Sequence, residues 1–364
     1  MVMLARSLLL FVSIFPPLSF GQSSPWLLTT TELPSHYSNP KLMPTLGNGQ
    51  LAVNPYLQLD PEVPPSITAN CLYSGDSWNS HRARFSILDI STVFKRKSLF
   101  RIPNYSNYKL SLSNSDMRGD YTLDLKRAQF LANFESDDFL VSHQVLVHRV
   151  YTRTIVNVVT GSAKQDSDSS LTVDIALEVG PVSDDITNTE VTEIEIFNNT
   201  LGIEKIWYRC ETTKEVEFSQ YQPSPTQVCF AWMEPWDSSL YLNGQNPETD
   251  QRIFLTVVDD SIEEILEEIL LVSSNSLDSL LDLHYGSWDE IWSTGNVQVE
   301  GDDNLARVLL SSQYYLYTSL PFPSLSARPL PSFCGLTPGG HAFKGKDYPG
   351  HSFGTPPFGC IQLF

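Results

Sequence analysis

The chain has 364 residues and a formal net charge of −19 at pH 7, from 23 Lys and Arg against 42 Asp and Glu. This acidic balance argues against a nucleic-acid partner, because binding to phosphates needs basic patches. The length suits one large or two ordinary domains, and the five cysteines are too few and too scattered for a disulfide scaffold.

Residues 1–21 predict a secretory signal peptide. Arg6 supplies a positive charge, an apolar run extends from Leu8 to Phe15, and small residues precede a cleavage point after Gly21. A membrane anchor is the weaker alternative, because the run is well short of the roughly 20 residues that span a bilayer. We therefore expect a protein of the secretory pathway, free of the membrane after cleavage, in the lumen, a lysosome or the medium.

In the predicted compartment, two sequons can be glycosylated and cysteines can form disulfides. Asn104 and Asn198 become usable glycosylation sites if the signal peptide is real. Cys210 and Cys229 flank a region with the pattern of a strand pair, and they are the candidate disulfide. The odd count leaves one thiol over, for which Cys360 is the candidate. No C-x-x-C pair occurs, so no structural zinc site or other metal is expected.

Residues 22–258 predict a large antiparallel β-sandwich. The stretch FLVSHQVLVHRVYTRTIVNVVTGS has the alternation of two successive strands, rich in Val, Ile, Thr and Tyr. The stretches LTVDIALEVG, TEVTEIEIFNN and QRIFLTVVDD repeat this pattern at spacings typical of a sandwich.

Residues 259–321 predict a helical linker. The stretch DDSIEEILEEILLVSSNSLDSLLDLHYGSWDEIW has apolar residues at helical spacing and acidic residues in its first turn. A second helix is predicted over GDDNLARVLLSSQYYLYTSLP, capped by Asp302 or Asp303 and stopped by Pro321. Its periodic residues are Leu305, Val308, Leu309, Gln313 and Leu316.

The histidines do not predict a metal site. His143 and His148 are five residues apart in a strand pattern, so their side chains point to opposite faces and cannot share one ion locally. His81 lies beside Arg82 and Arg84, where it could bind a carboxylate or a sugar hydroxyl. A solvated turn is the more ordinary interpretation of that cluster.

Two further motifs are weak signals. Trp232 and Trp236 flank Glu234, an arrangement that could stack on a sugar, although core tryptophans are the more ordinary interpretation. Gly47-Asn48-Gly49 is not followed by a helical pattern, so a phosphate cradle is not expected there. No nucleophile elbow, P-loop or Rossmann fingerprint occurs, and no cofactor is predicted.

Several stretches together resemble glycoside hydrolase family 65. LMPTLGNGQLAVNPY and LYSGDSWNSHRARF resemble its N-terminal sandwich, and HYGSWDEIWSTGNVQVEGDDNLARVLLSSQYYLYTSLP resembles its linker helices. GLTPGGHAFKGKDYPGHSF resembles the approach to its (α/α)6 catalytic barrel, so the resemblance implies that residues 322–364 begin such a barrel. By the same resemblance, Tyr348 and His351 are the candidate substrate-binding residues.

The resemblance also implies an activity and a departure from it. The family contains acid trehalases, maltose and kojibiose phosphorylases, and the glucosidase that acts on glucosylgalactosyl-hydroxylysine of collagen, to which TLGNG and NSHRARF are closest. After Phe353 the Trp-Asp pair of the family pattern is absent. The general-acid Glu is expected beyond residue 364, as in a truncated gene model or splice form of a longer enzyme.

The expected function is therefore inverting hydrolysis of an α-linked glucose, with a carbohydrate or glycosylated collagen peptide as partner. Because the catalytic carboxylates are expected outside this sequence, the 364-residue chain itself is expected to be inactive, and whether it is an enzyme stays open. The alternatives are a trehalase or disaccharide phosphorylase of the same family, or a non-catalytic carbohydrate-binding fragment.

Overall fold

A computed structural model describes a large part of the chain between residues 24 and 318. The described ranges are 24–33, 44–53, 55, 67–69, 105–113, 116–164, 168–179, 186–187, 190–195, 201, 203–214, 225, 227–235, 238–245 and 249–318. The predicted signal peptide, the sequon asparagines Asn104 and Asn198, and the residues His81, Trp236, Tyr348, His351 and Cys360 lie outside these ranges.

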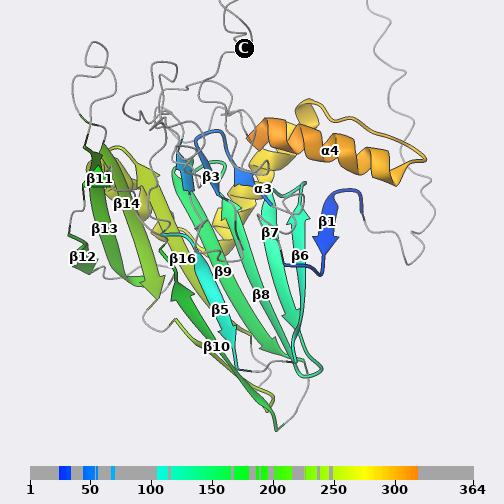
Figure 1. The fold of residues 1–364 in the computed structure, drawn as a ribbon, viewed down its shortest axis with the longest axis horizontal. Coiled ribbons are helices and arrows are strands. Elements are labelled where there is room, and N and C mark those ends of the chain that lie inside the picture. The colour runs from blue at the N-terminus through cyan, green and yellow to red at the C-terminus, as the bar shows by residue number, and fades with distance from the viewer. Residues whose placement is uncertain are drawn as a thin grey trace, which may run out of the picture.

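A ten-stranded antiparallel sheet forms the main layer (Figure 1). In spatial order it contains β1 (Leu27–Thr30), β6 (Arg118–Asp124), β7 (Gln129–Glu135), β8 (Phe139–Val147), β9 (Thr154–Ala163), β16 (Asp250–Asp259), β14 (Gln227–Pro235), β13 (Ile203–Thr213) and β11 (Ile186–Thr187), while β12 (Thr192–Glu195) also pairs with β13. Both strands expected between residues 139 and 162 are present as β8 and β9, which pair along their whole lengths.

A three-stranded sheet lies against one face of the main sheet (Figure 1). It contains β15 (Leu240–Asn243), β10 (Ser170–Leu177) and β5 (Tyr108–Leu112). The approach is close, because a Cβ atom added at Gly161 of β9 would lie 2.8 Å from Leu242 Cδ1. The apolar core between the two sheets includes Phe139, Val173 and Phe254. The prediction of a mainly β fold built from large antiparallel sheets is confirmed.

A third small sheet, of β2 (Leu46–Gly47), β3 (Leu51–Val53) and β4 (Ile67–Ala69), lies near the upper ends of the main strands (Figure 1). Leu46, Leu51 and Val53 pack into the same core as Val147 of β8. The turn between β2 and β3 includes Asn48 and Gly49, in the stretch that carries part of the family resemblance.

Within the described residues, three helices follow β16, where the sequence predicts two. They are α2 (Ile262–Ser273), α3 (Leu277–Thr294) and α4 (Asp303–Thr318). The single helix expected after Asp259 is broken because Ser274 ends α2, and the Ser276 hydroxyl caps α3 by accepting from the Ser279 amide at 3.2 Å. The apolar face of α2 packs on the back of the main sheet, where Ile265, Ile269 and Val272 share a core with strand residues.

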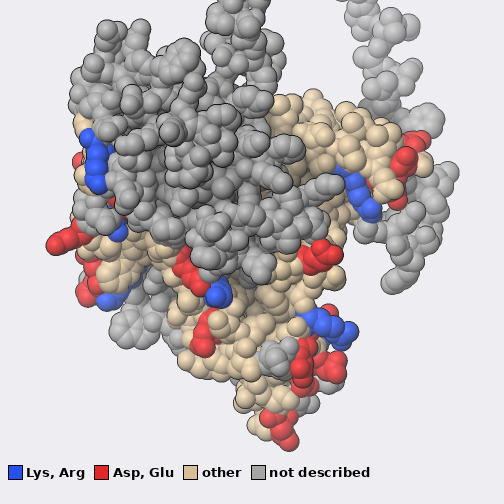
Figure 2. Space-filling view, viewed as in Figure 1, with Lys and Arg blue, Asp and Glu red and all other residues tan. Residues whose placement is uncertain are grey.

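The buried face of α4 differs from its predicted apolar period. Ala306, Leu310, Tyr314 and Thr318 are buried, at four-residue steps, whereas Leu305, Val308 and Leu316 are exposed. In Figure 1, α4 lies beyond the upper ends of the strands and α3 runs behind the sheet. The face drawn in Figure 2 shows more acidic than basic side chains toward its lower end, in keeping with the acidic composition.

A disulfide joins the neighbouring strands β13 and β14. It links Cys210 and Cys229, which lie directly opposite each other in the register. This is the pair that the sequence nominates. Cys229 is fully buried on the face of the sheet that α2 covers.

Candidate functional site

The described candidates among the predicted binding residues have structural roles. His143 is buried on β8 and bonds Asn157 Oδ1 through Nε2 at 3.0 Å, while His148 lies in the turn after β8. Trp232 is 6% exposed, and its ring stacks on Tyr105 with centroids 3.9 Å apart. The side chain of Glu234 is not described. Trp232 is therefore a core residue rather than an open sugar platform.

Instead, the structure brings the loop between β2 and β3, which belongs to a family-like stretch, into contact with the turn between β8 and β9. We call the place where these two segments meet α3 and α4 the junction. We call residues 45–50 the Asn48 loop and residues 148–153 the β8–β9 turn. The Asn48 side chain is buried, and its Nδ2 donates to the carbonyls of His148 and Thr152, both at 2.8 Å. Its Oδ1 accepts from the amides of Gln50 and Leu51, at 2.9 and 2.8 Å. One amide group thus uses all its donor and acceptor capacity to join the loop to the turn.

Replacing Asn48 is expected to destabilise the protein strongly. Asn48→Ala leaves two buried carbonyls and two amides without this partner, and we expect unfolding to become easier by about 3 kcal/mol. Asn133→Ala is the matched control, because Asn133 on β7 is half-buried and bonds only side chains. Urea unfolding followed by tryptophan fluorescence measures both changes, and equal losses in the two variants would contradict the assigned role.

Two neutral histidines attach α3 to the sheet. His148 accepts the Val150 and Tyr151 amides at Nδ1, at 3.1 and 2.9 Å, and donates from Nε2 to Leu280 O of α3 at 2.9 Å. His284 of α3 accepts the Arg149 amide at Nδ1 and donates from Nε2 to the Arg127 carbonyl. These partners assign the Nε2–H tautomer to both rings.

Burial keeps both rings neutral. It lowers the pKa of His148 to about 4, with the hydrogen bond to Leu280 acting in the opposite direction. The pKa of His284 is lowered by burial first and then by the neighbouring His148 and Arg149. Because Nδ1 of each ring already accepts an amide, protonation would remove hydrogen bonds. At His284 this is the bond from the Arg149 amide, which joins α3 to the turn, and at His148 these are the bonds from Val150 and Tyr151, which shape the turn itself.

The His-Trp-Trp pattern of the family resemblance is the buried stripe of α3. His284, Trp288 and Trp292 lie one turn apart and are all buried. Trp288 stacks on Tyr314 of α4 with centroids 5.8 Å apart, and the Tyr314 hydroxyl donates to the Thr45 carbonyl of the Asn48 loop at 2.9 Å. The spacing of His284, Trp288 and Trp292 in the sequence therefore reflects the packing of α3 at the junction, where it contacts α4.

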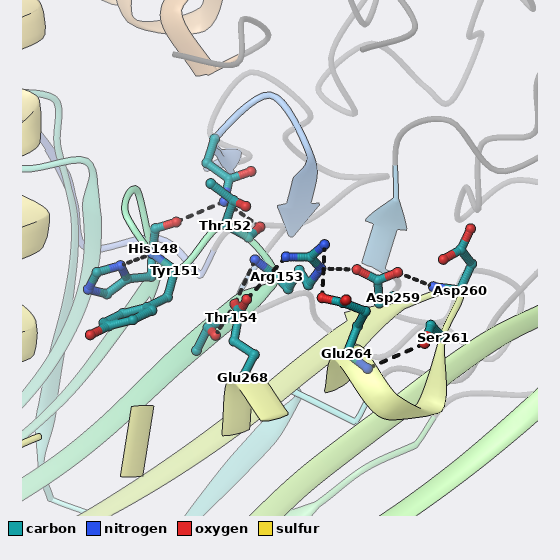
Figure 3. A network of polar contacts seen from close by, with 11 residues as sticks. His148, Tyr151, Thr152, Arg153, Thr154, Asp259, Asp260, Ser261, Glu264 and Glu268 are labelled. Atoms are coloured by element: carbon teal, nitrogen blue, oxygen red, sulfur yellow. Dashed lines mark hydrogen bonds and ion pairs between the residues drawn. The ribbon is translucent and has the colours of Figure 1, made fainter. Parts of the chain in front are cut away.

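An arginine with three carboxylates attaches α2 to the same turn (Figure 3). Arg153 pairs with Asp259 at the end of β16, and with Glu264 and Glu268 of α2 at 3.5 and 3.4 Å. Glu268 also accepts the Arg153 amide at 3.0 Å and the Thr154 hydroxyl at 2.9 Å. The β8–β9 turn thus holds α2 through Arg153 and α3 through His148.

Glu211 is a buried carboxylate outside the junction. It lies on β13, fully enclosed, with Oε1 2.9 Å from Arg209 Nη2. Burial raises the pKa of Glu211 to about 7, while the charge of Arg209 acts to lower it. An enclosed carboxylate does not reach a substrate, so we do not assign it a catalytic role.

Two kinds of feature are absent from the described residues. Within the described ranges, no group of three His, Cys, Asp or Glu side chains is arranged to bind a metal ion. None of the described helices is long and apolar enough to cross a membrane.

Comparison with known proteins gives the junction a family context. No family model matches the chain. A curated relative from Mus musculus, protein-glucosylgalactosylhydroxylysine glucosidase, is 24% identical over 344 residues, which is 92% of this chain and 43% of the relative. The Dictyostelium discoideum protein of the same name is 26% identical over 271 residues, covering 69% of this chain and 33% of the relative. This chain is similar to protein-glucosylgalactosylhydroxylysine glucosidases.

A third glucosidase of that name, from Danio rerio, is 35% identical over 72 residues, covering 19% of this chain and 11% of the relative. The chain thus spans less than half the length of the curated relatives it matches. A solved structure named as a kojibiose phosphorylase from the human microbiome aligns with a TM-score of 0.54 at 10% identity, over 82% of this chain and 42% of that one. The structural match supports the fold, and the matches together confirm the resemblance predicted from the sequence.

Sequence reasoning missed the residues that build the junction. Asn48, Arg149 and Arg153 carry no motif for catalysis, and each has a partner more than 100 residues away in the chain. The signal that could have found Asn48 was its place between two glycines in the family-like TLGNG stretch.

Proposed function

We propose that the chain is the sheet-bearing part of a glucosidase that removes α-linked glucose from glucosylgalactosyl-hydroxylysine of collagen. The observation that supports this most is the 24% identity over 92% of the chain to the mouse glucosidase of that name. The junction adds support, because the two family-like stretches that the structure describes best, 45–50 and 284–318, contact each other there.

In this proposal the described residues have a supporting role. The main sheet and the three described helices form one platform, of which Thr318 is the last described residue. Residues 335–353, which resemble the approach to a catalytic barrel, lie further along the sequence, after residues 319–334. The chemistry proposed from the resemblance is inversion: one carboxylic acid protonates the leaving oxygen and a carboxylate activates water on the opposite face of the sugar.

The test compares two preparations. The native protein is immunopurified from its source with an antibody against residues 118–163, and the 364-residue polypeptide is produced recombinantly. We expect the native protein to release glucose from glucosylgalactosyl-hydroxylysine, as the β-anomer when proton NMR is recorded before mutarotation. The polypeptide is expected to release none, because the resemblance places the general acid outside its sequence.

Each outcome has a clear meaning. A native protein that cleaves trehalose instead, or that needs phosphate to cleave a disaccharide, would replace the proposed substrate by one of the family alternatives. A native protein that binds the collagen disaccharide without cleaving it would favour a carbohydrate-binding role. Glucose release by the 364-residue polypeptide would refute its expected inactivity.

Sensitivity of the native protein to an endoglycosidase tests the proposed secretory route, with Asn104 and Asn198 as the sites.

A further inference from the structure

The C-terminal end of α4 needs hydrogen-bond partners that the helix does not supply. The last carbonyls of any helix find no amide donor within the helix, and they lie at the negative end of the helix dipole. A basic side chain in the last turn often satisfies both needs. The last turn of α4, however, contains no basic residue. Thr318, its final residue, is nevertheless buried.

Two distant parts of the chain reach this helix end. Arg149 of the β8–β9 turn donates from Nη1 to the Tyr317 carbonyl at 3.4 Å, across 168 residues of sequence. The Gly49 amide of the Asn48 loop donates to the Thr318 carbonyl at 2.8 Å. The last two carbonyls of the helix are therefore bonded from outside it.

Arg149 is held in place for this contact. Its guanidinium carbon lies 5.1 Å from the ring centroid of Trp288, and its side chain is almost fully buried. Its own amide donates to His284 of α3. Burial lowers the pKa of Arg149 to about 9, so the group is still cationic at neutral pH. A fixed positive charge next to the negative end of a helix dipole is stabilising, and more so where water is excluded.

The two glycines of the loop fit the helix end closely. A Cβ atom added at Gly47 would lie 3.0 Å from the Thr318 carbonyl oxygen and 3.3 Å from the Thr318 Cβ. Gly49 has a φ of +87°, a left-handed conformation that side chains with a Cβ rarely adopt. The loop therefore requires glycine at both positions. At Gly47 there is no space for a side chain, and at Gly49 the backbone conformation disfavours one.

We propose that Arg149 and the Asn48 loop form a C-terminal cap for α4 supplied from outside the helix, and that Arg149 is the positioning residue for the last turn of α4. The importance of the cap for catalysis rests on the proposed function, whereas the cap itself does not.

Hydrogen exchange of the 364-residue polypeptide tests the cap without any need for activity. In Arg149→Ala we expect the amides of the last turn of α4, residues 315–318, to exchange on the order of tenfold faster. Amides of β8, β9 and the first turns of α4 should keep their rates, because the hydrogen bond that is lost lies at the end of the helix. Arg127→Gln is the matched control, since Arg127 also lies over a ring of α3, that of Tyr285 at 4.9 Å, but is not a partner of these carbonyls.

Chemical rescue separates positioning from a general packing defect. Guanidinium ion, added below denaturing concentrations, should restore slow exchange at residues 315–318 of Arg149→Ala, and urea at equal concentration should not. Arg149→Lys, which keeps the charge but not the planar donor, should show a smaller increase than Arg149→Ala. Gly47→Ala should give the same local increase if Arg149→Ala fails to fold. Uniform acceleration throughout the sheet, or unchanged exchange at residues 315–318, would overturn the proposal. If the native protein releases no glucose while the cap in the polypeptide is intact, the result would count against the proposed function alone.

Discussion

Acidification from pH 6.5 to pH 4.5 is expected to remove about 2 kcal/mol of stability through His148 alone, because its pKa falls from 6.5 in the unfolded chain to about 4 in the folded protein. A depressed folded pKa means that the unfolded chain binds the proton more readily in this window. Stability is therefore fully present above pH 6.5 and declines until the folded pKa is reached. His143, whose pKa burial also lowers to about 4, adds to the same trend.

The measurement is urea unfolding at pH 7.5, 6.5, 5.5 and 4.5 for the wild type and for His148→Gln. Glutamine does not titrate, so the variant should be less stable at pH 7.5 yet lose about 2 kcal/mol less between pH 6.5 and 4.5. Subtraction of the two curves removes the contribution of the many carboxylates. Parallel curves would show that His148 does not remain neutral in the folded state.

Removing the Glu268 carboxylate is expected to cost about 3 kcal/mol, since breaking a buried ion pair leaves the partner charge without compensation. In Glu268→Ala the Arg153 amide and the Thr154 hydroxyl also lose an acceptor. Asp259 continues to pair with Arg153, which keeps the loss at the lower end of the range for such pairs.

Glu264→Ala is the matched control, one turn earlier in the same helix. It makes the same change in helix propensity, but the Glu264 side chain is 42% exposed and lies 3.5 Å from Arg153, so we expect a loss of less than about 1 kcal/mol. Thermal and urea unfolding at pH 7.5 measure both variants. If the two lose similar amounts, the Arg153 cluster does not carry the attachment of α2.

Some of these features follow from short-range sequence patterns. Alternation between residues 139 and 162 predicted β8 and β9, because a strand with one buried face must alternate. Two cysteines at the ends of a strand pair pointed to the disulfide, since facing positions of neighbouring strands are close enough to bridge. The family-like stretches predicted the resemblance that the matches to known glucosidases confirm.

Other features depend on contacts that spacing does not report. The apolar period runs through Ser274 and Ser276, so the break between α2 and α3 is visible only from the hydrogen bonds that the serines make. On α4 the apolar Val308 is exposed, whereas the more polar Thr318 is buried. Thr318 is buried because it contacts the Asn48 loop, and the apolar spacing of the helix does not show this contact. The junction itself joins polar residues from distant parts of the chain, and no local pattern encodes such pairs.

The hydrogen bond between Tyr314 and Thr45 has a consequence for biosynthesis. It spans 269 residues, so the Asn48 loop leaves the ribosome long before its partner helix. At the usual 5–20 residues per second, the wait is roughly 15 to 50 s. During that time β2 and β3 lack their packing against α4, and of their partners only those made earlier, such as β8, are present. The Asn48 loop is thus made early, but its packing against α4 can be completed only late in synthesis.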